Sequence, residues 1–484
     1  MTTSETTGGV DPMNIKKEIY IDGEWSAPEA DAEPIVVQNP ATEESIAQVP
    51  TCGAEDVDRA VNAASAAFEG WSTTSVAQRR KYFSRLHEIA KRREEEILHS
   101  IVSEIGHPIE RARINQTGAG IADLGMLAEY LDDIIWEEKL GETRIRRVPA
   151  GVVAAITPWN APLRAIAIKA GAAMAAGCTV VLKGSEIAPM VSFIFAEMVE
   201  EAGFPRGVFN LVSGSGSEVG EPMATHDLVE MVSLTGSVGA GRRVMELASR
   251  SVKRVALELG GKSANIILPD ADLAHAVDVG IEDAFRSSGQ VCGALSRMLV
   301  PASRIDEVKE LVAQKVNSFV VGDPFDSASQ LGPVASESQR ARVEGYIQKG
   351  IDEGMTLLAG GTGRPDGFER GAYVRPTAFL GTNEHTPAQE EIFGPVLTVI
   401  PFDDDADAVR IANDSQYGLA GAVWSGDQGR AIAVAERIRT GRVRINGAPV
   451  DKRAPHGGFK LSGIGREQGR IGIEEFLEYQ TLSI

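Results

Sequence analysis

Short apolar runs and longer amphipathic segments alternate along residues 151–258. The apolar runs are rich in β-branched residues and end at glycine or proline, as buried strands do; they are GVVAAITP, CTVVLKG, GVFNLVSGSG, LVEMVSLTGS and VKRVALELGG. Segments between them, such as PLRAIAIKAGAAMAAG, carry apolar residues at helical spacing and end at a glycine. Strands that alternate with helices pair in parallel, so this region predicts a doubly wound α/β sheet.

The rest of the chain divides into three further kinds of segment. A second alternation fills residues 259–435, with apolar runs such as RMLVPA and VLTVIPF, and predicts another α/β domain. The first 120 residues are predicted to be largely helical. Residues 126–147 and 468–484 fit neither alternation; they predict short amphipathic strands, which are candidates for subunit contacts.

Composition and charge narrow the function classes. A chain of 484 residues is too long for one core. Its net charge of −20 argues against nucleic acid or an anionic membrane as the main partner. Three distant cysteines make neither a disulfide framework nor a zinc spacing, and residues 1–12 have neither the basic start nor the apolar stretch of a targeting signal. The sequence predicts a cytoplasmic protein that begins with a disordered tail.

Cys292 lies in the polar segment FRSSGQVCGALSR, whereas Cys178 in AAGCTVV is typical of core packing. Gly289 and Gly293 flank Cys292 and have no side chains, so the segment predicts a close approach to the backbone. A free buried thiol is the alternative that this segment alone leaves open.

A nucleotide site is suggested by placement more than by motif. No G-x-G-x-x-G follows a predicted strand, but SLTGSVGAGRR is strand, glycine turn and helix, which directs backbone N–H groups and the Ser237 hydroxyl at an anion. A merely structural turn is the alternative. Lys183 and Glu186 follow another strand, and a carboxylate there accepts hydrogen bonds from ribose hydroxyls while it repels a 2′-phosphate, which favours NAD over NADP.

Seven motifs together resemble the NAD(P)-dependent aldehyde dehydrogenase superfamily over nearly the whole chain, from YIDGEW to the tail. In chain order they are TPWNAP (157–162), KGSE (183–186), LTGSVGAG (234–241), LELGGKS (257–263), GQVC (289–292), EEIFGPV (390–396) and GGFKLSGIGRE (457–467). The resemblance implies a Rossmann-like NAD-binding domain (1–125 and 148–258), a catalytic domain (259–435) and a small β oligomerisation arm (126–147 and 468–484). Residues 436–467 would return the chain to the cofactor domain. It also implies a homodimer or homotetramer that acts on an aldehyde without a metal.

The resemblance assigns roles to individual positions. Cys292 falls on the nucleophile, Glu258 on the general base, Asn160 on the oxyanion-stabilising amide, and Lys169 with Glu467 on a proposed proton relay. The cofactor positions are Trp159, Lys183, Ser185, Glu186, Gly216, Gly236, Ser237, Gly241, Leu259, Glu391 and Phe393. The positions expected to line the substrate pocket are Ala161, Arg164, Arg286 and His456.

These roles define a reaction. A cysteine is nucleophilic near neutral pH and leaves well from a thioester, so it can carry an aldehyde through a thiohemiacetal to an acid. The implied function is NAD-dependent oxidation with hydrolytic deacylation. A CoA-acylating semialdehyde dehydrogenase is one alternative, although such members generally lack the base; a non-catalytic NAD-binding structural member is the other.

Departures from the family pattern concern the cofactor turn and the substrate. Gly184 replaces a frequent proline and Ser287 a common asparagine. Ala161 stands where an aromatic residue is common, and His456 where phenylalanine is frequent. Because arginine grips carboxylates, Arg164 and Arg286 favour a substrate larger or more polar than acetaldehyde, such as a semialdehyde acid. The alternative is that these side chains turn outward to solvent.

Overall fold

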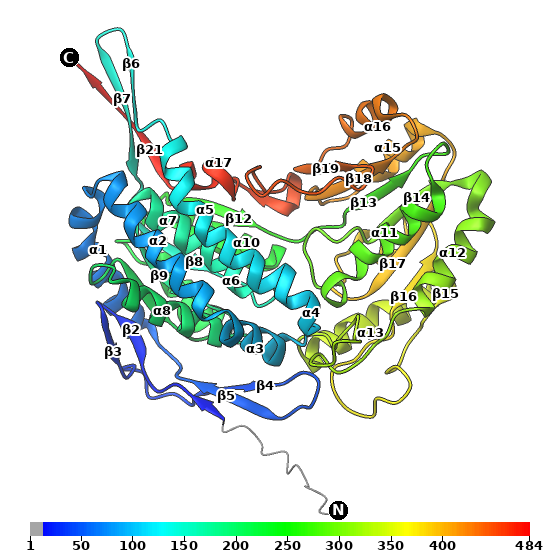
Figure 1. The fold of residues 1–484 in the computed structure, drawn as a ribbon, viewed down its shortest axis with the longest axis horizontal. Helices are drawn as coiled ribbons and strands as arrows, with labels where there is room; N and C mark the ends of the chain where they lie inside the picture. The colour runs from blue at the N-terminus through cyan, green and yellow to red at the C-terminus, as the bar shows by residue number, and fades with distance from the viewer. Residues whose placement is uncertain (1–12) are drawn as a thin grey trace, which may run out of the picture.

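The computed structural model describes residues 13–484 and contains two sheets with helices around each (Figure 1). Residues 1–12, for which the sequence predicts a disordered tail, lie outside the described residues. The two α/β units lie side by side, and a small antiparallel sheet projects from the first of them (Figure 1). The predicted α/β class is confirmed.

The first unit is built on a six-stranded sheet in the order β10-β9-β8-β11-β12-β20, parallel except for its last strand. Its strands are β8 (Val152–Ile156), β9 (Thr179–Lys183), β10 (Phe209–Val212), β11 (Met231–Thr235), β12 (Arg254–Glu258) and β20 (Gly463–Ile464). All five predicted strands are present. Strand β20 comes from the predicted return segment and closes the sheet beside β12.

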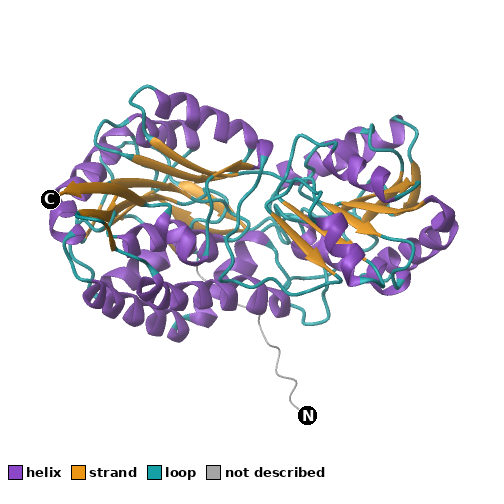
Figure 2. Cartoon of the chain, turned by 90° about the horizontal axis from the view of Figure 1, so that it is seen from above, coloured by secondary structure: helices purple, strands orange, loops and turns teal. Residues whose placement is uncertain are grey.

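Helices cover both faces of this sheet (Figure 2). They include α1 (Ala54–Ser72), α2 (Val76–Arg92), α3 (Glu94–Ile105), α4 (Ile109–Ala112), α5 (Ala119–Asp133), α8 (Met190–Ala202), α9 (Glu221–Thr225) and α10 (Val238–Ser249). The segment after β8 is not one regular helix: α6 (Pro162–Ile166) and α7 (Ala172–Ala176) are separated by the π-helical turn η2 (Ala167–Gly171). Two more π-helical turns are η1 (Arg113–Gly118) and η3 (Gly216–Gly220).

The second unit is built on a seven-stranded sheet in the order β15-β16-β17-β14-β13-β18-β19, in which only the β15–β16 pair is antiparallel. Its strands are β13 (Ala264–Ile267), β14 (Arg297–Pro301), β15 (Thr356–Ala359), β16 (Thr377–Leu380), β17 (Val396–Phe402), β18 (Ala420–Trp424) and β19 (Arg442–Ile445). Its helices are α11 (Leu273–Phe285), α12 (Ile305–Asn317), α13 (Glu337–Asp352), α14 (Thr386–Gln389), α15 (Asp405–Asn413) and α16 (Gln428–Ala435).

The predicted helical start of the chain is wrong before residue 50. Five short strands fill this region: β1 (Asn14–Ile15), β2 (Ile19–Ile21), β3 (Glu24–Ser26), β4 (Ile35–Gln38) and β5 (Ser45–Val49). They form a hairpin and a three-stranded sheet against the first unit, where Ile19 and Val49 are fully buried. Strands of two to five residues are too short for a period of two to stand out in the sequence.

The two segments outside the main alternations pair with each other. Strands β6 (Glu137–Leu140), β7 (Thr143–Pro149) and β21 (Leu477–Ser483) form an antiparallel sheet in the order β21-β7-β6. Their side chains are mostly exposed, and residues 126–133 belong to α5 rather than to the strands. In the part of the chain from residue 13 onward, no helix is long and apolar enough to cross a membrane.

Candidate active site

The strand order of the first sheet fixes where a ligand can bind. From β8 the chain runs outward through β9 and β10, then returns to place β11 and β12 on the other side of β8. Such a switch point opens a crevice beyond the carboxyl ends of the strands. Asn160, Gly236 and Glu258 follow or end β8, β11 and β12, so the topology brings them to one edge.

Loops that precede strands of the second sheet face the carboxyl ends of the strands of the first sheet. Leu259 and Gly260 lie before β13, Cys292 before β14, and Glu391 and Phe393 before β17. Together with the switch-point residues they line one cleft. Clefts between two domains and at the switch point of a parallel sheet are frequent binding sites for cofactors and substrates.

The loop that carries Cys292 is held in an unusual backbone conformation. Ser287 and Ser288 both have positive φ angles, and their hydroxyls bond His107 at 2.9 Å and the Gly332 carbonyl at 2.8 Å. At Gly289, φ is 75°, and a Cβ would lie 2.0 Å from the Gly394 carbonyl oxygen. The close approach predicted at this glycine is therefore made by the protein's own backbone. These contacts fix Cys292, which remains partly exposed in the cleft.

The Asn160 side chain points at the same loop. Its amide nitrogen donates to the Gln290 backbone carbonyl at 3.0 Å, and the backbone carbonyl of Asn160 accepts from the Gln116 side chain at 2.8 Å. An amide nitrogen carries two hydrogens, so one remains for a second acceptor. The arrangement directs a donor toward the space beside Cys292.

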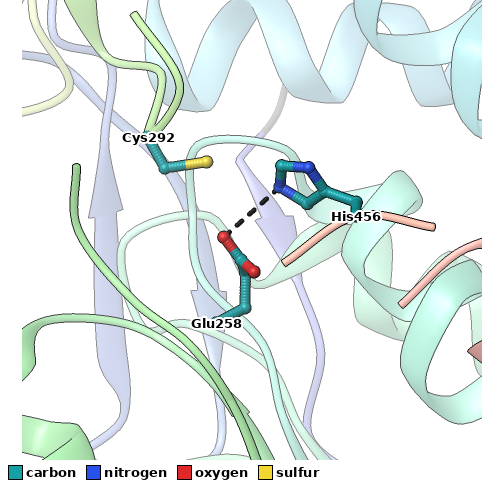
Figure 3. Close-up of side chains that lie close together, drawn as sticks. All are labelled: Glu258, Cys292 and His456. Carbon is teal, nitrogen blue, oxygen red and sulfur yellow. Dashed lines mark ion pairs between the residues drawn. The ribbon is translucent and has the colours of Figure 1, made fainter. Parts of the chain in front are cut away.

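Glu258 ends β12, where β20 runs antiparallel and places Gly463 opposite it. Its side chain is only 5% exposed, and Oε1 has no hydrogen-bond partner within residues 13–484. Oε1 lies 3.3 Å from Nε2 of His456 (Figure 3). One carboxylate oxygen, one imidazole nitrogen and the Cys292 sulfur all lie within 4.8 Å of one another. The candidate nucleophile and the candidate base are thus in one pocket.

Lys169 and Glu467 form a buried ion pair behind this group. Lys169 lies in the π-helical turn η2, and its ammonium also contacts the Ser233 hydroxyl at 3.2 Å. The backbones of Glu467 and His456 exchange two hydrogen bonds of 2.7 Å. Glu467 is thus bonded through its backbone to His456, whose side chain lies next to Glu258. Irregular π-helical turns such as η2 are frequent at functional sites.

Helix α10 brings its N-terminus to the cleft. Ser237 caps the helix through the Ala240 N–H at 3.1 Å and lines the cleft beside Gly236. A Cβ on Gly241 would lie 2.6 Å from Leu259, so glycine lets the helix pack closely on the start of the second unit. A helix N-terminus with free N–H groups favours a phosphate.

Lys183 ends β9 and pairs with Glu186 at 3.0 Å. Lys183 is buried, whereas Glu186 is exposed and lines a neighbouring hollow. Ser185 is buried and its hydroxyl accepts from the Ile187 N–H at 3.2 Å; Gly216 begins the π-helical turn η3 with open space around it. Lys183 can donate a hydrogen bond and Glu186 can accept one, which suits a ligand with two neighbouring hydroxyl groups.

Glu391 and Phe393 hold the other end of the cleft. Burial raises the pKa of Glu391, and Oε1 accepts from the Gly261 N–H at 3.0 Å. Phe393 packs edge-on against Trp159 with ring centres 5.4 Å apart. Two residues of helix α13 complete this end: Gln339 donates to the Phe393 carbonyl at 2.8 Å and Arg342 to the Glu391 carbonyl at 2.7 Å.

The four predicted substrate-pocket residues have separate surroundings. Ala161 caps the short helix α6. Arg164 is already paired with Asp123 of α5 at 2.8 Å. Arg286 makes no ion pair in the described chain and lines a hollow with Arg111, Asn115, Val279, Glu282 and Asp283. Of the four, His456 is the one that lies against Cys292 and Glu258.

Comparisons with known proteins agree with this site. The model of the aldehyde dehydrogenase family matches residues 25–482. A 3-succinoylsemialdehyde-pyridine dehydrogenase of Pseudomonas is 48% identical, with 97% of this chain and 99% of that protein aligned.

Solved structures match equally closely. Aldehyde dehydrogenase C of Pseudomonas syringae, a cysteine-to-alanine variant with NAD+ and octanal, has a TM-score of 0.96 at 47% identity, covering 98% of this chain and 99% of that one. A Mycobacterium tuberculosis aldehyde dehydrogenase with NAD+ has a TM-score of 0.95 at 40% identity, covering 98% and 99%.

The chain belongs to the aldehyde dehydrogenase family. The predicted family and enzyme class are confirmed, and with them the use of NAD and the oxidation of an aldehyde. The individual roles of the site residues stay predictions.

Proposed function

We propose that this aldehyde dehydrogenase uses Cys292 as its nucleophile, Asn160 with the Cys292 backbone N–H as its oxyanion donors, and Glu258 as the base that activates water. The observation that carries the proposal is the convergence of the three side chains on one cleft between the two sheets. An assay of a panel of aldehydes with NAD, followed by absorbance of the reduced nicotinamide, tests it. No activity with any aldehyde would contradict it.

The residues of the cleft fit NAD. The α10 N-terminus and Ser237 suit a pyrophosphate, and Lys183 with Glu186 suits the two hydroxyls of an adenosine ribose. Buried Glu391 offers an acceptor near the Trp159–Phe393 pair. When bound, NAD supplies the acceptor for the hydride that leaves the substrate carbon, so that a thioester remains on Cys292.

The chain's own groups carry the other steps. The sulfur of Cys292 adds to the aldehyde carbon, and the carbonyl oxygen becomes an alkoxide. The second N–H of the Asn160 amide stabilises this oxygen; one such donor is typically worth about 3 kcal/mol. Glu258 then takes a proton from water as the water attacks the thioester, the C–S bond breaks, and the acid leaves.

We expect Glu186→Ser to narrow the preference for NAD over NADP. Removing one negative charge beside a 2′-phosphate at an exposed site is worth about 1 kcal/mol, or roughly fivefold in the ratio of kcat/KM for NADP to that for NAD. Glu201→Ser changes the same charge on α8, where the side chain pairs with Arg92, and serves as the control. A wild type that prefers NADP would refute the role of Glu186.

For the substrate we propose an aldehyde larger than acetaldehyde with an anionic end that meets Arg286. Among residues 13–484, Arg286 lacks an ion pair, whereas its acidic neighbours are already bound: Glu282 to Arg111 and Asp283 to Arg444. A partly buried guanidinium without a partner is costly unless an anion joins it. Arg164 is already paired with Asp123, so its guanidinium does not need an anionic partner from the substrate.

The difference between Arg286, which has no ion pair, and Arg164, which has one, allows a matched test. We expect Arg286→Leu to lower kcat/KM for a semialdehyde acid by about 10- to 100-fold, the range for a lost charged hydrogen bond, and to leave its methyl ester nearly unchanged. Arg164→Leu should affect acid and ester alike, because Asp123 already occupies that guanidinium. Equal efficiency of acid and ester in the wild type would reject the anionic substrate.

We also propose that sheet β21-β7-β6 joins subunits into a homodimer or homotetramer. Leu140, Tyr479 and Ile484 are large, apolar and exposed on it, and the outer edge of β6 has no partner strand in the described chain; exposed edges invite pairing with another chain. The domain limits given above remain a proposal. We also propose a cytoplasmic location, because the three cysteines make no disulfide.

A further inference from the structure

His456 is held in place by its backbone. Its N–H and carbonyl exchange hydrogen bonds of 2.7 Å with Glu467, across an isolated antiparallel bridge. A Cβ on the next residue, Gly457, would lie 2.8 Å from the Gly465 carbonyl oxygen. The bridge fixes the direction of the side chain, which turns inward to Glu258 and Cys292 (Figure 3).

The imidazole is only 12% exposed and has an incomplete set of partners. Nδ1 is buried without a hydrogen bond in the described chain. Nε2 lies 3.3 Å from Oε1 of Glu258, yet this oxygen is also left without a well-aligned hydrogen bond. The Cys292 sulfur is the other acceptor within reach of the ring, since all three groups lie within 4.8 Å of one another.

The charges around the ring favour its protonated form. Burial lowers the pKa of His456, but attraction to Glu258 and to Cys292 outweighs burial and raises this pKa well above its usual range. Glu467, on the bridged strand, is turned to Lys169. The guanidinium of Arg466 binds the carbonyls of Gly458 and Gly465. Burial lowers the pKa of Arg442, and attraction to a negative charge on the Cys292 sulfur opposes this effect.

We propose that His456 is a second acid–base residue of the site, which takes the proton of Cys292 and pairs as an imidazolium with the resulting sulfur anion. The inference rests on Cys292 as the nucleophile. In this step the S–H bond breaks and an N–H bond forms at Nε2; no electrons move between groups and no further reactant is needed. A cysteine beside a protonated histidine is a nucleophile over the whole neutral range.

The proposal separates the work of the two acid–base groups. His456 generates the sulfur nucleophile and keeps its proton while the thioester forms. Glu258 serves the attacking water. When the thioester hydrolyses, the C–S bond breaks and the electron pair returns to a sulfur that still faces the imidazolium, which stabilises the leaving group.

The test is the pH dependence of Cys292 alkylation by iodoacetamide, followed by mass spectrometry on the whole protein without cofactor. Cys52 and Cys178 are buried, so the partly exposed Cys292 reacts first. In the wild type we expect alkylation rates at pH 6.5 and 8.5 to agree within about threefold. An ordinary thiol with a pKa near 8.5 is only about 1% ionised at pH 6.5, so in His456→Phe the rate should fall about 50-fold between the two pH values.

Two further variants separate charge from packing. His456→Gln keeps a polar side chain that cannot be protonated, and we expect it to behave as His456→Phe does. His99→Phe, at an exposed position on α3, should keep the wild-type profile. A flat profile in either His456 variant would overturn the proposal. If the wild-type protein has a flat alkylation profile but no dehydrogenase activity, the result would instead contradict the proposed function.

Discussion

Cys292→Ser should reduce dehydrogenase turnover by at least about a thousandfold, because a serine hydroxyl in the same place is a far weaker nucleophile at neutral pH. The substitution removes no packing of consequence, since Cys292 is partly exposed and its loop is held by Ser287, Ser288 and Gly289. Steady-state formation of reduced nicotinamide measures the loss, and thermal unfolding should stay unchanged.

Cys178→Ser is the matched control for this substitution. Cys178 is buried far from the cleft, and its sulfur donates to the Phe476 carbonyl at 3.4 Å, a bond that a hydroxyl can keep. We expect turnover within about twofold of the wild type. A Cys292→Ser enzyme that kept a tenth of the wild-type rate would show that another group attacks the aldehyde.

The sequence predicts the first sheet well because its strands are buried on both sides. Each is a mostly apolar run closed by glycine or proline, and the alternation with helices leaves only a few topologies. The functional residues at the strand ends, Asn160 after β8 and Glu258 at the end of β12, follow from that topology. The family motifs then assign their chemistry.

Other parts of the site depend on contacts between distant segments, which no local pattern reveals. Gln339 and Arg342 belong to a helix that reads as an ordinary solvated one, yet they bind the carbonyls of Phe393 and Glu391. Arg164 and Asp123 pair although they lie on separate helices, which removes Arg164 as a free cation. The irregular turn at Lys169 is equally hidden, because its sequence is a regular apolar helix.

His456 is the clearest example. The sequence places it among the substrate-pocket residues, as a departure from a frequent phenylalanine. The structure brings it beside Glu258 and Cys292, because β20 and the bridge to Glu467 return the chain to the end of β12. Its role thus depends on a return segment whose path the local sequence does not predict.

Glu258→Gln should separate the two halves of the reaction. Glutamine keeps the size of the side chain but cannot accept a proton, and general-base catalysis is typically worth 10²–10⁴-fold. We therefore expect a burst of about one equivalent of NADH per site, followed by turnover slowed about 100-fold or more, because hydride loss precedes the hydrolysis that Glu258 serves. Stopped-flow absorbance measures both phases.

The control and the contrary results are specific. Glu230→Gln makes the same change just before β11, at the amino ends of the strands, where the side chain accepts from the Val152 N–H at 2.7 Å, and it should keep a normal steady state. A Glu258→Gln enzyme with no burst, but with Cys292 still alkylated, would refute the role of Glu258 in hydrolysis. Restoration of turnover by coenzyme A would identify CoA rather than water as the acyl acceptor.

The Glu258→Gln variant also tests whether the charge of Glu258 affects the protonation of His456. Attraction to Glu258 raises the pKa of His456, so removal of that carboxylate should lower the pH above which the imidazolium is lost. The sulfur remains as the other partner of the ring. Alkylation of Cys292 in Glu258→Gln should therefore stay flat through pH 6.5, in contrast to His456→Phe. A profile that instead follows the His456 variants would mean that Glu258, and not His456, takes the proton of the nucleophile.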